Sequence, residues 1–194
     1  MKESRKKIIL TALLTLFSFS VFGIVFVNAT LYSPNGEIEI AKEPALRYPV
    51  RLSIPSLGIN AKVQRVGITK KGNMAAPSNF ADVGWYKYGT IPGGRGSAVI
   101  AGHVDNGLAL PGVFKNLENI KNGDDIYITT TQKNNPIHFV VKNIAIYSFD
   151  SPTGNIFNNK DGSLIQLVTC TGTWVPQYGT HDKRLVVTAE RYYQ

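Results

Sequence analysis

The sequence predicts an all-β domain, a sandwich or a barrel of seven or eight short strands, behind an N-terminal transmembrane helix. Two observations predict the domain: from residue 48 the chain breaks into short runs rich in Val, Ile, Thr and Tyr, and turn dipeptides such as Asn-Gly and Asp-Gly separate them. A third is a composition of 43% hydrophobic and 18% charged residues, which excludes disorder for most of the chain.

The transmembrane helix is the first predicted element. Residues 8–29 form a run of 22 residues without a charged side chain. A helix of that length reaches across a bilayer core of about 30 Å. The four bases within residues 1–7 predict a cytoplasmic N-terminus, a single-pass anchor in the cell membrane, and an extracellular domain. The alternative is a signal peptide cleaved after residue 29, although the apolar region of such peptides is typically only about 7 to 15 residues long.

The net charge of +8 is concentrated at the start of the chain. Residues 1–7 hold four bases and one acid, so the rest of the chain carries a net +5. A basic cluster beside an apolar segment orients an anchor, whereas nucleic-acid binding needs a basic patch on the folded domain. The sequence therefore predicts the membrane as a partner through residues 8–29 and no nucleic-acid partner.

Strands follow a predicted linker at residues 30–47 and occupy the domain at residues 48–194. Alternation is clearest where Ile137, Phe139 and Val141 share one face. The predicted strands are residues 50–54, 59–66, 97–102, 125–131, 137–147, 164–170 and 184–190.

One short helix is predicted at residues 112–119. Val113, Phe114 and Leu117 would share one face there at helical spacing.

Cys170 is the only cysteine and the first candidate for chemistry. It ends the run 164–170, and the Thr-Gly-Thr that follows predicts a half-exposed thiol at a strand end, as nucleophilic work requires. A core cysteine is the alternative. A single cysteine excludes an internal disulfide and a Cys-rich zinc site, and the sequence has no HExxH or phosphate-binding loop. No metal and no cofactor is therefore predicted.

Three histidines are candidates for the proton partner of a thiol. His103 follows an apolar strand that ends in glycine, so its imidazole would emerge at a strand end as Cys170 does. His138 alternates with apolar residues and is most simply a solvent-facing strand residue. His181 lies in a loop near Cys170 in sequence and could be only a solvated turn residue.

Arg184 is the candidate for oxyanion stabilisation. It begins the last predicted strand, and its side chain lies on the face opposite Leu185 and Val187. A guanidinium that stays protonated and presents several N–H groups can stabilise a developing oxyanion. The alternative for an arginine at a strand start is a solvated charge.

Three motifs in this order resemble the sortases, the cysteine transpeptidases of Gram-positive cell surfaces. They are AGHVD at 101–105, LVTCT at 167–171 and RLVV at 184–187, and VGWY at 83–86 is also family-like. The resemblance extends from about residue 49 to residue 190, and it is closest to the class F or class E sortases.

The resemblance implies an eight-stranded β-barrel and a set of site residues. It implies that Cys170, His103 and Arg184 are catalytic, with Cys170 as the nucleophile, His103 as the acid and Arg184 as the oxyanion donor. Thr169 would line the peptide groove, although a structural role as a strand residue is equally open. The segments 150–163 and 171–183 would be loops that shape substrate selection. Ile156 and Phe157 in the first of them would floor a leucine or proline pocket, or else pack against the barrel.

The resemblance also implies the partners. The substrates would be surface proteins with a C-terminal LPXTG-like sorting signal, cleaved at the Thr-Gly bond through a thioester. The acceptor would be an amine such as a lipid-linked cell-wall precursor. The alternatives are a membrane-tethered β-barrel binding module without activity and an L,D-transpeptidase, whose Ser-x-Gly-Cys signature differs from the Thr169-Cys170 pair here.

Overall fold

The computed structural model describes residues 47–106, 108, 110–132 and 135–193. The predicted anchor at residues 8–29 and nearly all of the predicted linker lie outside these residues. Across the described part, no helix has the length and apolar character needed to span a bilayer.

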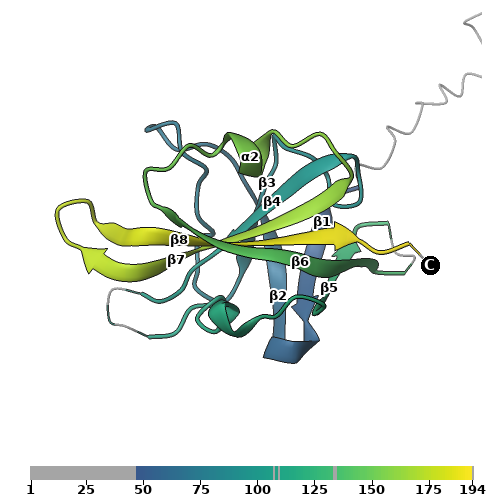
Figure 1. The fold of residues 1–194 in the computed structure, drawn as a ribbon, viewed down its shortest axis with the longest axis horizontal. Coiled ribbons are helices and arrows are strands. Elements are labelled where there is room, and N and C mark those ends of the chain that lie inside the picture. Colours follow the sequence, from purple (N-terminus) through teal and green to yellow (C-terminus); the bar gives the residue numbers. More distant parts are fainter. Residues whose placement is uncertain (1–46, 107, 109, 133–134, 194) are drawn as a thin grey trace, which may run out of the picture. The chain divides into compact units, whose positions relative to one another are not determined.

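Eight strands of the described residues close into a barrel in the order β1-β2-β3-β4-β7-β8-β6-β5 (Figure 1). The β2–β3 and β4–β7 pairs are parallel, and the other pairs are antiparallel. The predicted all-β class is confirmed, and of the two architectures left open the barrel is correct. The strands are β1 (Pro49–Ile54), β2 (Ile59–Val66), β3 (Val83–Tyr86), β4 (Gly96–Gly102), β5 (Asp125–Thr130), β6 (Ile137–Ser148), β7 (Ser163–Val175) and β8 (Thr180–Arg191).

Inward-facing side chains fill the barrel with a single apolar core. On β6, Ile137, Phe139 and Val141 are buried, as their alternation predicts. The largest fully buried side chains include Trp85, Phe114 and Phe139. This core fixes the register of the strands, so residues at the strand ends are held in defined places.

The segment after Cys170 is a strand, so the loop predicted at residues 171–183 is wrong. β7 continues to Val175 and pairs with β8 from Thr180, and the two strands form the hairpin in yellow tones at the left of Figure 1. The register shifts between Thr171 and Trp174, and Gly172 between them has a φ of +80°. A glycine that usually marks a chain break here forms an irregularity within a strand pair.

The helix predicted at residues 112–119 is also wrong, because only η2 (Leu117–Asn119) forms as a 3₁₀ turn. The amides of Lys115, Leu117 and Asn119 donate to the carbonyls three residues earlier, as in tight turns, and not four residues earlier as in an α-helix. The predicted apolar face nevertheless packs on the core. Two further short helices are η1 (Pro55–Leu57) and α2 (Gly154–Phe157), the latter within the segment predicted as a loop.

Candidate active site

His103, just beyond the end of β4, lies at the same level as Cys170 in the middle of β7, so the prediction that the thiol lies at a strand end is wrong. These strands are parallel neighbours, with Ala101 opposite Val168, and His103 and Cys170 each lie two residues beyond that pair. Parallel neighbours are about 4.8 Å apart, so the register places the two residues next to each other on neighbouring segments of the chain. Both side chains line the same groove.

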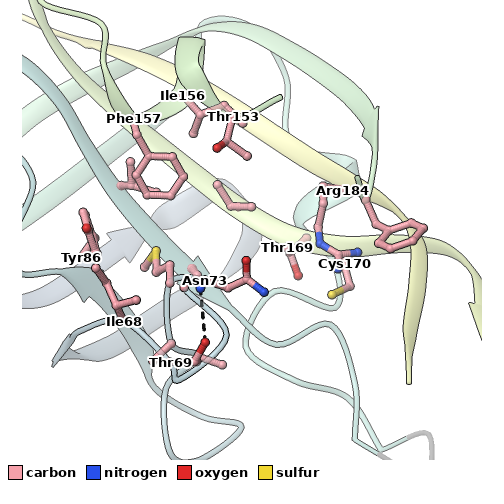
Figure 2. A pocket seen from close by; sticks show the side chains of 18 of the residues that line it. Ile68, Thr69, Asn73, Tyr86, Thr153, Ile156, Phe157, Thr169, Cys170 and Arg184 are labelled. Atoms are coloured by element: carbon pink, nitrogen blue, oxygen red, sulfur yellow. Dashed lines mark hydrogen bonds between the residues drawn. The ribbon is translucent and has the colours of Figure 1, made fainter. Parts of the chain in front are cut away.

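Arg184 lies beside Cys170 on the next strand. The two residues are directly opposite each other in the antiparallel β7–β8 pair, so their side chains project on the same face. Their neighbours Thr169 and Leu185 are only 4% and 3% exposed. Cys170 and Arg184 therefore point outward, and Figure 2 shows them side by side. The barrel thus places His103 directly after β4, Cys170 on β7 and Arg184 on β8, three strands that are successive neighbours.

The imidazole of His103 is held by the segment between β2 and β3. Its Nε2 lies 3.0 Å from the carbonyl oxygen of Pro77, which can only accept a hydrogen bond. Nε2 therefore carries the proton, and Nδ1 is the nitrogen free to exchange one. The ring of Phe80 packs on the imidazole with 4.6 Å between ring centroids. Neither Pro77 nor Phe80 carried a sequence signal for this role.

A hydrogen-bond network fixes the segment that carries Pro77. The side-chain amides of Gln64 and Asn79 donate to the carboxylate of Asp82, and the backbone N–H and the hydroxyl of Ser78 donate to Oε1 of Gln64. The hydrogen bonds from Gln64 and Asn79, with a smaller attraction to Lys62, lower the pKa of Asp82 below its ordinary value of 3.8.

We expect this network to make the protein less stable in acid. A carboxyl group with a lowered pKa contributes stability above its unfolded pKa, and that contribution is lost as the pH falls toward the folded pKa. Thermal unfolding between about pH 6 and pH 3 should show a smaller loss of Tm in Asp82→Asn than in the wild type. Parallel curves for the two proteins would contradict this assignment.

Thr169 ties β7 to the residue that precedes His103. It lines the groove, but its buried hydroxyl donates to the carbonyl oxygen of Gly102 at 2.8 Å. The predicted groove residue is therefore also a structural link between the middle of β7 and the end of β4.

We expect Thr169→Val to destabilise the protein by about 1–3 kcal/mol, because the substitution keeps the shape and removes a buried hydrogen bond. Urea denaturation measures the change. Thr169→Ser retains the hydroxyl and should lose less stability. A valine variant as stable as the wild type would show that the Gly102 carbonyl finds another partner.

Gly112 was missed by the sequence analysis and sets the backbone of His103. A Cβ atom at position 112 would lie 2.3 Å from the carbonyl oxygen of His103. The amide of Gly112 donates to Val104, and the amide of Phe114 donates to the His103 carbonyl. Only glycine allows this approach.

The guanidinium of Arg184 is held by its own strand. Its Nη1 donates to the carbonyls of His181 and Lys183 at 2.9 and 2.8 Å, and its Nη2 donates to the Thr180 hydroxyl at 2.8 Å. No carboxylate pairs with it among the described residues, whose ion pairs are His138–Asp125 and His181–Asp105. The positive charge beside Cys170 is therefore uncompensated by an acidic side chain.

A groove of about 1210 Å³ leads to these residues. Its lining includes Val99 and Ala101 of β4, Val168 of β7, and residues 68–77 of the β2–β3 segment. Ile156 and Phe157 of α2 also line it, and Figure 2 shows them across the groove from Ile68 and Thr69. The Phe157 ring packs edge-on against Tyr86 at 5.4 Å.

The other two histidines lie outside the lining of this groove. The Nε2 of His138 is 2.7 Å from Asp125, and its ring stacks on Tyr127. His181 lies 3.8 Å from Asp105 and contacts the edge of Trp174. Of the three, only His103 shares the groove with the thiol.

The described residues contain no cluster of three or more His, Cys, Asp or Glu side chains that could hold a metal ion. A thiol, an imidazole with a free Nδ1 and an uncompensated guanidinium supply the three roles that cysteine-dependent acyl transfer needs. The fold and site thus define a β-barrel with the layout of a cysteine acyltransferase. The chain belongs to the sortase family, since the family described as "Sortase domain" matches residues 52–192.

Solved sortase structures share the fold. Sortase C1 of GBS Pilus Island 1 is 20% identical with a TM-score of 0.57, over 74% of this chain and 64% of that one, so the chain spans less than two thirds of that protein. Sortase A from Corynebacterium diphtheriae is 26% identical with a TM-score of 0.58, over 78% and 64%. Sortase C-1 from Actinomyces oris is 23% identical with a TM-score of 0.56, over 87% and 82%. Comparison with curated protein sequences gives no match.

Proposed function

We propose that the chain is a membrane-anchored cysteine transpeptidase that cleaves an LPXTG-like sorting signal at the Thr-Gly bond. It transfers the protein to an amine acceptor such as a lipid-linked cell-wall precursor. The observation that carries this proposal is that His103, directly after β4, and Cys170 and Arg184, on the neighbouring strands β7 and β8, line one groove of a sortase barrel.

In the first half-reaction, the Cys170 thiolate attacks the Thr carbonyl carbon and a C–S bond forms. Arg184 stabilises the oxyanion with N–H groups beside the thiol. His103, as imidazolium, gives the Nδ1 proton to the leaving Gly nitrogen, the C–N bond breaks, and a thioester remains. The Pro77 carbonyl oxygen accepts a hydrogen bond from Nε2–H throughout, so Nδ1 remains the exchanging nitrogen.

In the second half-reaction, the acceptor amine attacks the thioester carbonyl. His103, now neutral, takes a proton from the attacking nitrogen at Nδ1. The new peptide bond forms as the C–S bond breaks, and the thiolate and imidazolium of the starting state are restored. The cycle needs no cofactor.

The sequence supports the finer assignments. The compact domain and the VTCTG motif at 168–172 favour class F or class E. The uncharged run at residues 8–29 behind a basic cluster supports a single-pass anchor in the cell membrane with the catalytic domain outside.

Intact-protein mass spectrometry with a library of LPXTG-like peptides tests the proposal. The expected product is an adduct on Cys170 with the mass of the peptide fragment that ends at Thr, which a small primary amine then discharges. If no library member forms an adduct, the chain is a barrel without transpeptidase activity.

A further inference from the structure

A braced loop in the β2–β3 segment presents one side chain to the groove. Ile68 and Met74 form an isolated antiparallel bridge. Within that bridge, the Thr69 amide donates to the Asn73 carbonyl at 2.8 Å, and the Asn73 amide donates to the Thr69 hydroxyl at 3.3 Å (Figure 2). Gly72, with a φ of +83°, closes the turn by donating to the Thr69 carbonyl. The backbone of Asn73 is therefore fixed on both its N–H and its C=O.

The carboxamide of Asn73 points away from this loop into the groove. Asn73 is among the residues that line the groove. Figure 2 shows its side chain reaching into the space between Thr69 and Phe157, which lie on opposite sides of the groove. Its backbone makes the bonds given above, whereas its side-chain amide bonds to no other residue of the described chain. A carboxamide has two donor hydrogens and an acceptor oxygen, so both functions face the groove unused.

Asn73 lies between the two ends of the groove. In Figure 2, Tyr86 and Ile68 lie on one side of it, and Cys170 and Arg184 lie on the other. A peptide that places an apolar side chain near Phe157 and Tyr86 and its scissile carbonyl at Cys170 must pass Asn73. An extended peptide presents N–H and C=O groups along its length, which a carboxamide can pair with simultaneously.

We propose that Asn73 is a substrate-positioning residue that forms a two-point hydrogen bond with one backbone segment of the bound peptide. Its Oδ1 accepts from a peptide N–H and its Nδ2 donates to a peptide C=O. This inference rests on the proposed function, because it takes the groove as the site of the sorting peptide. The fixed loop backbone means that little conformational freedom is lost when the peptide binds.

Peptide binding to the Cys170→Ala protein tests this proposal without needing turnover. Fluorescence anisotropy with a labelled LPXTG peptide should give a Kd about tenfold higher in Cys170→Ala/Asn73→Ala than in Cys170→Ala, as expected for two lost hydrogen bonds. Asn119→Ala is the matched control, because Asn119 is an exposed asparagine outside the groove lining. It should leave the Kd unchanged.

A series of peptides, each with one backbone amide replaced by an ester or N-methyl amide, identifies the bonded segment. One replacement should weaken binding to Cys170→Ala and have no further effect once Asn73 is alanine.

In the enzyme with Cys170 intact, Asn73→Ala should raise KM while kcat stays within about twofold. An unchanged Kd, or backbone replacements of equal effect with and without Asn73, would overturn the proposal. Peptide binding that depends on Asn73 in a chain that never forms an acyl-enzyme would instead count against the transpeptidase function alone.

Discussion

Replacing Cys170 with alanine should lower the turnover of a sorting peptide by at least about 10³-fold, the scale seen when a catalytic nucleophile is removed. Cys170 is the only cysteine in the chain, so no second thiol can take over. It is half-buried at the groove, whereas its neighbour Thr169 faces the core. The substitution therefore removes the nucleophile without opening a core cavity, and Tm should change by only a few degrees.

Two measurements separate chemistry from folding in this variant. Intact mass spectrometry should show no peptide adduct, and a thiol reagent should label the wild type once and Cys170→Ala not at all. Cys170→Ser is the matched control of similar size. Its hydroxyl ionises far less readily than a thiol, so we expect an equally large loss of turnover. Residual turnover within tenfold of the wild type in Cys170→Ala would exclude the thioester route.

The barrel could be predicted from the sequence where strands alternate and are long enough to show it. On β6, the buried Ile137, Phe139 and Val141 alternate with half-buried residues, and the strand forms close to its predicted bounds, whereas β8 contains the predicted residues 184–190 but begins earlier, at Thr180. β3 was not predicted as a strand, because Val83–Tyr86 is only four residues long and is buried over its first three positions, so it shows no alternation. Its place in the barrel follows from its pairing with β2 and β4. No local pattern or turn signal in the sequence predicts that pairing.

The candidate site could be predicted only in its chemical groups. Cys170 and Arg184 lie at the ends of the predicted runs, and His103 follows a predicted strand. The carbonyl of Pro77 that orients the imidazole comes from a segment without periodicity. Every residue has a backbone carbonyl, so the sequence does not indicate which one accepts the hydrogen bond from His103. Tertiary packing alone determines it.

Arg184→Ala should lower the rate of acyl-enzyme formation by about 10²–10³-fold, the loss measured when an oxyanion donor is removed. The guanidinium is directly opposite Cys170 and has no carboxylate partner among the described residues, so its charge is available to a developing oxyanion. Single-turnover mass spectrometry of the peptide adduct measures this step alone.

Arg184→Lys distinguishes charge from geometry. Lysine keeps the positive charge but not the planar fork that bonds Thr180 and His181 while presenting N–H groups to the groove. We therefore expect an intermediate loss of about 10- to 100-fold.

Arg95→Ala is the matched control, because Arg95 also donates to a backbone carbonyl, that of Lys160, but lies outside the groove lining. Alkylation of Cys170 by iodoacetamide forms no oxyanion, so Arg184→Lys should alkylate at nearly the wild-type rate. If alkylation and acylation fell together in Arg184→Lys, Arg184 would act on the thiol itself, and the oxyanion would need another donor.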